Sequence, residues 1–208
     1  MMNKRRVDVS KPRRRAPAEP KRDGRVVRTR HALGKALTEL MLDRPLDRIT
    51  VQEVLDRARV GRSTFYAHFR DTRDLFLSDF ERFLGVLEAW LDDPGAPKGR
   101  LVPVREFFSH VVEAKALIQA LRASGELDIV WAIALGHFAR MIEKRLEMPT
   151  HGAPLPRPLA ARFLAGALME MLKGWLDTAE RPTARAMDES FHALAKRSFG
   201  STLPRGQV

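Results

Sequence analysis

The segment from residue 61 to residue 69 alternates hydrogen-bonding side chains with aromatic rings. Phe65 and Phe69 are four residues apart, so a helix places both rings on one face. The other face would present donors and acceptors suited to base edges and to phosphate oxygens. That face would hold Gly61, Arg62, Ser63, Thr64, Tyr66 and His68. Arg62 and Thr64 are best suited to reading base edges. Both can form hydrogen bonds with bases, and Thr64 also offers a methyl group to thymine.

A short helix is predicted directly before this segment, over residues 50–58. Thr50 and Glu53 are spaced as a capping box, in which each side chain binds the backbone amide of the other residue. A short break then separates the two helices, which is the arrangement of a helix-turn-helix. In that motif the second helix enters the major groove of DNA and the first crosses the backbone. The alternative is that both segments are ordinary core helices of an α-helical bundle.

Positive charge is concentrated at the N-terminus of the chain. The net charge is +11, and residues 1–30 hold twelve Lys or Arg against three acidic residues, which leaves a net +2 for the remainder. Residues 1–24 contain three prolines and almost no apolar periodicity, so they predict a flexible basic arm. Such an arm, followed by Arg28 in the first helix, suits nonspecific contact with DNA phosphates. The alternative for a basic tail is a solvated segment with no partner.

Apolar residues at spacings of three and four predict helices along the rest of the chain. The Asp93-Pro94-Gly95 stretch is the clearest internal breaker. No strand pattern competes with the helical one, so the predicted fold class is all-α. Besides the two short helices, a long helix is predicted to open at residues 71–74 and to run through Trp90. The other predicted helices span residues 25–44, 101–123, 127–147, 157–179 and 183–198.

Thr50 to Leu75 resembles the N-terminal domain of TetR-family bacterial transcriptional regulators. The resemblance rests on Thr50-Val51-Gln52-Glu53-Val54, on Thr64-Phe65-Tyr66-Ala67-His68-Phe69 and on Asp74-Leu75, and it covers roughly residues 25–92. The chain departs from the family at three positions. Arg59 stands where the family usually has a small residue, Gly61 where it often has Ser, and Arg73 where it usually has Lys. Arg59 must take up the turn without glycine's freedom, whereas Arg73 keeps the charge that holds a phosphate.

Three parts are therefore expected. Residues 1–24 would be a disordered basic arm, and residues 25–70 an N-terminal three-helix helix-turn-helix DNA-binding bundle. Residues 71–208 would be an α-helical ligand-binding and dimerisation domain, as the resemblance implies. The residues expected to contact DNA are Arg28, Thr50, Gly61, Arg62, Ser63, Thr64, Tyr66, His68 and Arg73. Tyr66, His68 and Arg73 suit phosphate oxygens more than bases, so they would set register without reading sequence.

The resemblance also implies a dimer interface and a pocket for a small apolar ligand in the second half. Large side chains with a few polar groups would line such a pocket. The expected ligand-binding residues are Phe107, His110, Trp131, His137, Phe138 and Met141. Small residues among large apolar ones on the last two helices suit a four-helix bundle between two subunits. The expected interface residues are Phe163, Ala167, Met171, Trp175, Phe191 and Leu194, with a core inside one subunit as the alternative.

Other classes of protein find little support. The sequence has no cysteine, no glycine-rich phosphate loop, no paired metal ligands and no nucleophile motif, so we expect neither an enzyme nor a metal or other cofactor. No apolar run is long enough for a membrane span or a signal peptide, and a cytoplasmic location is expected.

The resemblance implies a repressor that binds operator DNA as a homodimer and is released by a small molecule. Two alternatives stay open. One is a sequence-independent DNA-binding protein, and the other is a TetR-like regulator without a small-molecule inducer.

Overall fold

The computed structural model describes residues 21–147 and 155–199, and these residues form helices and no strand. The all-α prediction is confirmed. Residues 1–20, most of the predicted arm, lie outside the described part, and α1 begins at Lys21 instead of residue 25. None of the described helices has both the length and the apolar character that a membrane span requires. The helices are α1 (Lys21–Met41), the 3-10 turn η1 (Leu46–Arg48), α2 (Val51–Ala58), α3 (Arg62–Tyr66), α4 (Thr72–Leu91), α5 (Val104–Glu113), α6 (Lys115–Ala123), α7 (Leu127–Arg145), α8 (Arg157–Asp177) and α9 (Ala184–Phe199).

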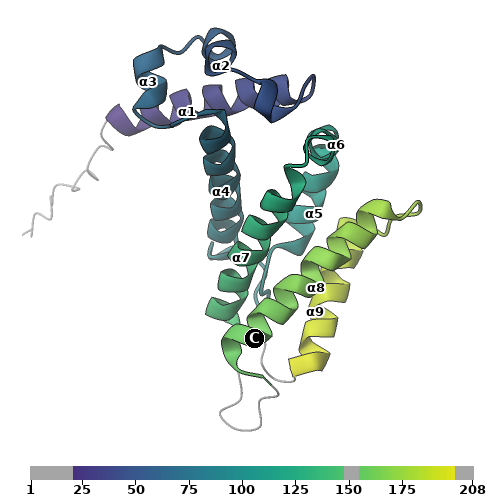
Figure 1. Ribbon diagram of the computed structural model, residues 1–208. Helices are drawn as coiled ribbons and strands as arrows, with labels where there is room; N and C mark the ends of the chain where they lie inside the picture. Colours follow the sequence, from purple (N-terminus) through teal and green to yellow (C-terminus); the bar gives the residue numbers. More distant parts are fainter. Residues whose placement is uncertain (1–20, 148–154, 200–208) are drawn as a thin grey trace, which may run out of the picture.

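The first three helices form a small bundle at one end of the molecule, and α4 leads from it into the larger bundle of α5 to α9 (Figure 1). Phe65 is fully buried and Phe69 is 4% exposed, so both rings point inward as predicted. They belong to one buried cluster with Leu33 and Leu37 of α1 and with Leu75 of α4. This cluster, which we call the N-terminal core, fixes the orientation of α3.

The N-terminal core is completed by the corner where α6 turns into α7. Leu121, Leu127 and Val130 come from this corner and belong to the same buried cluster as the side chains of α1 and α3. A second cluster joins α5, α7, α8 and α9. Because a bundle of only three helices buries little apolar surface by itself, the corner supplies area that the N-terminal bundle lacks.

The predicted single helix over residues 101–123 is wrong, because the structure has two helices there. α5 ends at Glu113 and α6 begins at Lys115, with Ala114 between them at φ −85° and ψ 13°. The bend keeps Val111 in the second cluster and turns Leu121 toward the N-terminal core. No proline or glycine marks the bend, and it allows the two halves of the segment to pack in separate cores.

The turn between α2 and α3 depends on a left-handed residue. Arg59 has φ 53° and ψ 46°, and its backbone N–H donates to the carbonyl of Leu55. The Val60 N–H donates to the same carbonyl at 3.1 Å, which satisfies the end of α2. Residues with a Cβ adopt this conformation at an energetic cost that glycine avoids.

A neutral histidine on α9 forms a hydrogen bond with the segment before α5. The His192 Nε2 accepts from the Leu101 N–H at 3.2 Å, and Nδ1 lies 2.8 Å from the Asp188 carbonyl. Because a carbonyl only accepts and an amide N–H only donates, Nδ1 carries the proton and the ring is neutral. Burial lowers the pKa of His192 below its usual 6.5, although the nearby Asp188 opposes the shift. Arg100 bridges the same place by pairing with Asp188 at 2.5 Å and with Glu106 at 2.8 Å.

Replacing Arg59 by glycine should stabilise the protein. Arg59→Gly removes the left-handed penalty and should raise the free energy of unfolding by about 1 kcal/mol. Urea unfolding followed by circular dichroism measures the change. Arg59→Ala is the matched control, because it deletes the guanidinium but keeps the Cβ and should leave stability nearly unchanged. An equal gain in both variants would mean that the guanidinium, and not the backbone, is responsible.

Acidification should weaken the fold through His192. An unfolded chain takes up a proton on this ring near pH 6.5, whereas the folded protein resists it, so stability falls as the pH drops through that value toward the folded pKa. Urea midpoints at pH 7.5 and 5.5 should therefore differ less for His192→Gln than for the wild type. His31→Gln, on the exposed side of α1, should keep the wild-type difference. An unaltered pH dependence in His192→Gln would contradict this assignment.

Candidate nucleic-acid interface

α2 begins in the predicted capping box. The hydroxyl and the backbone N–H of Thr50 donate to the Glu53 carboxylate at 2.8 and 2.9 Å, and the Glu53 N–H donates to the Thr50 hydroxyl at 3.3 Å. Arg44 also pairs with Glu53 at 2.8 Å. Hydrogen bonds from Thr50, the backbone amide first, hold the pKa of Glu53 below its usual value. Thr50 thus fixes the start of α2, and its hydroxyl is engaged within the protein.

The polar side of the segment from Gly61 to Phe69, which we call the reading segment, faces solvent. On the inner side, the ring centroids of Phe65 and Phe69 are 5.7 Å apart. Tyr66 is 53% exposed, and its ring packs edge-to-face with the Phe65 ring at a centroid distance of 5.3 Å. Gly61, Arg62 and Ser63 are exposed, while Thr64 and His68 are half-buried. The inward rings therefore hold the segment, and the predicted polar residues form its outer surface.

Arg62 is held at the surface by a residue that the sequence analysis did not single out. Its Nη2 donates to Gln52 Oε1 at 3.0 Å, and Gln52 Nε2 donates to Asp56 at 2.7 Å. Gln52 and Asp56 both lie on α2, so the first helix of the motif orients a side chain of the second. The ten-residue separation between Gln52 and Arg62 leaves no local signal in the sequence.

Two more predicted DNA contacts lie outside α3. Arg28 is exposed on α1, near Arg30, whose guanidinium covers the Phe69 ring at 5.0 Å from its centroid. Arg73, at the start of α4, pairs with Glu126 at 2.9 Å. Glu126 is the residue before α7 and only 15% of its side chain is exposed. Arg73 can therefore hold a phosphate only in competition with a carboxylate of the second half.

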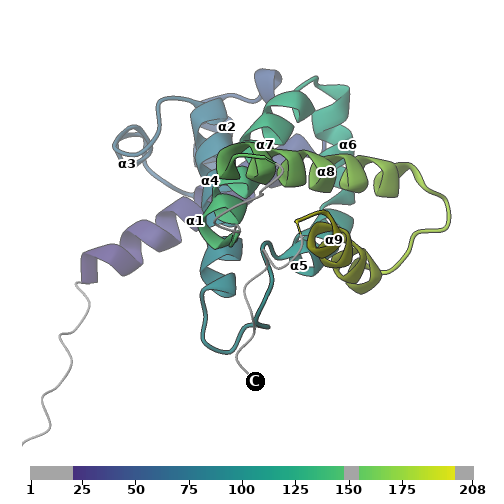
Figure 2. The same cartoon turned by 90° about the horizontal axis from the view of Figure 1, so that it is seen from below.

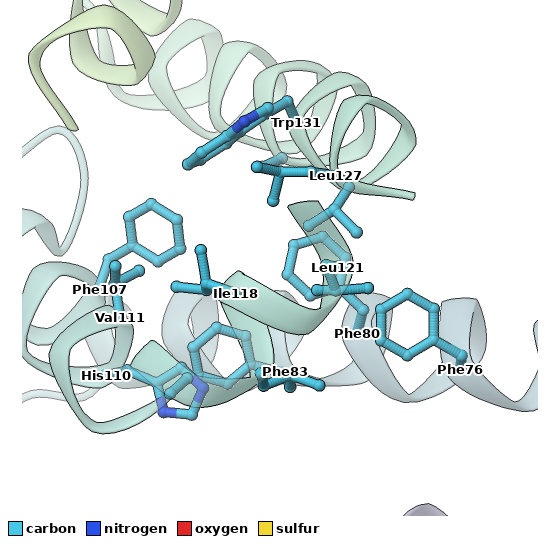
Figure 3. Close-up of a pocket in the computed structure, with 14 residues that line it drawn as sticks. Phe76, Phe80, Phe83, Phe107, His110, Val111, Ile118, Leu121, Leu127 and Trp131 are labelled. Carbon is cyan, nitrogen blue, oxygen red and sulfur yellow. The ribbon is translucent and has the colours of Figure 1, made fainter. Parts of the chain in front are cut away.

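A small cavity of about 80 Å³ lies between α4, α5, α6 and α7. Figure 3 shows Ile118 pointing into it, surrounded by aromatic rings of the neighbouring helices. His110 stacks on Phe83 with ring centroids 4.0 Å apart, and desolvation lowers the pKa of His110 below its usual value. The lining residues are Phe76, Phe80, Phe83, Phe107, His110, Val111, Ala114, Leu117, Ile118, Leu121, Leu127, Val130, Trp131 and Ala134. In the described part of the chain, no cluster of three His, Asp or Glu residues is arranged to hold a metal ion.

Half of the predicted ligand-binding residues line this cavity. Phe107, His110 and Trp131 do, whereas His137, Phe138 and Met141 do not. Phe138 and Met141 are buried in the second cluster, where Phe138 meets Phe107 at 4.8 Å. His137 faces α4, with Nε2 3.6 Å from a Glu88 oxygen, and burial lowers the pKa of His137. Ala134 lines the cavity and Phe138, one helix turn later, does not. Helical periodicity places both on the same side of α7, so it could not distinguish them.

α8 and α9 lie away from α3 (Figure 2), and both helices carry exposed apolar side chains. Phe163 of α8 and Leu194 of α9 are 56% and 55% exposed, and Ala167, one turn after Phe163, is also exposed. The prediction also missed Leu159, which is 51% exposed. Met171 is half-buried.

Trp175 and Phe191 correct the predicted set, because both point into their own subunit. They are 5% and 2% exposed, and Trp175 packs on Phe108 at 5.0 Å while its indole N–H donates to the Pro182 carbonyl. The predicted interface had mixed two faces of the same helices.

The sequence and the fold of this chain are similar to those of known bacterial regulators. A family model described as "Bacterial regulatory proteins, tetR family" matches residues 35–78. The HTH-type transcriptional regulator EthR of Mycobacterium tuberculosis is 25% identical over 209 residues, which cover 92% of this chain and 95% of EthR. The solved structure of the dihydroxyacetone kinase operon activator DhaS has a TM-score of 0.62 at 15% identity, over 84% of this chain and 98% of DhaS. The fatty acid degradation regulator FadR from Bacillus halodurans has a TM-score of 0.54 at 15% identity, over 85% and 97%.

The family match runs from α1 into α4 and includes the capping box, the left-handed turn and the reading segment. The likeness to EthR and to the two structures extends over most of the chain, so the second half shares the same overall plan. The part of the chain that carries α2 and α3 thus matches the tetR family of bacterial regulatory proteins as a helix-turn-helix, and the chain is similar to the transcriptional regulator EthR over most of its length.

Proposed function

We propose that the protein is a repressor that binds a palindromic operator as a homodimer in the cytoplasm and releases it when a small molecule enters the cavity. The observation that carries the proposal is the shared wall of that cavity. Leu121, Leu127 and Val130 line the cavity and also belong to the N-terminal core that holds the reading segment. A ligand that moves this wall therefore moves the DNA-binding helices.

Base reading is assigned to the outer edge of α3. Arg62 and Thr64 would read base edges, Arg62 from the position that Gln52 gives it, and Ser63 would assist. The other predicted residues would contact the DNA backbone and fix the register of the protein on the duplex. These residues are Arg28, Thr50, Gly61, Tyr66, His68 and Arg73. The Thr50 hydroxyl is already bonded to Glu53, so a phosphate would have to share that hydroxyl or bind the backbone of Thr50 instead.

The dimer is assigned to the exposed apolar side of α8 and α9. Leu159, Phe163 and Leu194 each leave more than half of their surface uncovered, and pairing with a second copy of the chain would cover it. An isologous dimer repeats the same surface on both subunits and gives two reading segments related by a twofold axis. Two such segments match the two halves of a palindrome.

The cavity is too small for an ordinary ligand in its present form. Its volume of about 80 Å³ compares with at least about 300 Å³ for typical small-molecule sites. Binding therefore requires that the aromatic walls and the corner between α6 and α7 move outward. A ligand can weaken DNA binding only if it binds the expanded form better than the closed one.

Selection from random duplex DNA tests direct reading. The wild type should enrich a palindrome, and Arg62→Ala should cost about 1–3 kcal/mol and relax the preference at one position of each half-site. Arg28→Ala is the control for backbone contact, because it should weaken all sequences alike and lower the salt slope by about one. Failure of the wild type to enrich any sequence would favour the sequence-independent alternative.

Removing the charge of Glu126 should strengthen operator binding. Glu126→Gln frees Arg73 for a phosphate, so affinity should rise several-fold and the salt slope should grow by about one. Fluorescence anisotropy with labelled operator at several salt concentrations measures both. Asp128→Asn removes an exposed acidic charge two residues away and serves as the matched control. A gain of the same size in Asp128→Asn, or a gain that survives Arg73→Ala, would show that Arg73 is not the residue released.

A further inference from the structure

A second cleft of about 70 Å³ lies beside the cavity, between α6 and the end of α8. Lys115 and Arg122 come from one side of α6, and Asp177 and Arg181 come from the end of α8 and the loop that follows. Three cations thus face one carboxylate. The cleft carries an excess of positive charge, although the chain after residue 30 is nearly balanced.

The cations of this cleft are only partly neutralised within the protein. Arg122 approaches Asp177 at 3.8 Å, and the two side chains are 61% and 68% exposed, so the pair is loose. Arg181 is held in place, because its guanidinium donates to the Thr178 carbonyl at 3.2 Å and stacks over Trp175. A guanidinium held in this way beside two exposed cations can form charge-assisted hydrogen bonds with an anion.

The cleft and the cavity share one wall residue. Ile118 lines both, so the basic cleft and the apolar cavity meet at this residue of α6. On the cavity side Ile118 faces aromatic rings (Figure 3), and His110 at the Phe83 end is the cavity's one titratable side chain. On the cleft side it lies with Lys115 and Arg122 on α6.

We propose that the ligand is an amphiphile with an apolar body and a single anionic head. The body occupies the cavity and displaces Ile118, and the head binds Lys115, Arg122 and Arg181 in the cleft. This inference rests on the proposed function, since it names the chemical class of the ligand for that cavity. A neutral ligand of the same shape fills the cavity but leaves the three cations unmatched, so it binds more weakly.

Two probes with the same apolar body test the proposal. Phenylbutyrate and phenylbutanol differ only in the head, which is a carboxylate in one and a hydroxyl in the other. Calorimetric titration of the full chain should give at least about tenfold tighter binding of the carboxylate, the effect of a charge-assisted hydrogen bond. In the Lys115→Gln/Arg122→Gln variant the ratio of the two affinities should fall to near one, with phenylbutanol unaffected. Arg105→Gln/Arg140→Gln, on exposed sides of α5 and α7, removes the same charge elsewhere and should keep the tenfold ratio.

The outcomes separate this inference from the proposed function. Equal binding of the two probes to the wild type overturns the anionic head and leaves ligand control intact, provided that both weaken operator binding. A carboxylate preference that survives Lys115→Gln/Arg122→Gln places the head elsewhere and also overturns the proposal. If neither probe binds, the anionic amphiphile is rejected as the ligand class, and operator release by other small molecules then decides the proposed function.

Discussion

The packing of the α6–α7 corner on the DNA-binding helices is the contact on which the rest of the structure depends. The N-terminal bundle is too small to close its own core, and Leu121, Leu127 and Val130 close it from the second half. The reading segment is therefore not an independent module on a linker. Because packed interiors are nearly incompressible, a displacement of the corner must shift the helices that hold Phe65 and Phe69.

The same corner also sets the electrostatics of the DNA surface. Glu126 is mostly buried and lies 2.9 Å from Arg73, so their attraction is less screened than that of a pair in open solvent. A phosphate that binds Arg73 would have to compete with this carboxylate. Apolar contacts of the corner thus determine where the reading segment lies, while the pair between Arg73 and Glu126 lowers the positive charge that the start of α4 presents.

Local features of the fold were predictable from the sequence, and contacts between distant residues were not. Thr50 and Glu53, the inward rings Phe65 and Phe69, and the strained turn at Arg59 each leave a signal within a few residues. The bend at Ala114 has no such signal, because it exists to serve two cores at once. Periodicity finds the apolar stripe of a helix but not its partner, which is why Trp175 was assigned to the wrong face. Arg73 and Glu126 are 53 residues apart, and only the folded chain joins them.

The small volume of the cavity is a condition for regulation. A ligand with equal affinity for the DNA-competent and the released forms shifts nothing, however tightly it binds. The closed cavity instead forces any sizeable ligand to displace Ile118 and the corner beyond it. An anionic head held in the cleft by α6 and the end of α8 would fix one end of the ligand, and its apolar body would then press on walls that include Leu121, Leu127 and Val130 of the N-terminal core. The two sites together would then convert affinity for one molecule into a directed movement of the reading segment.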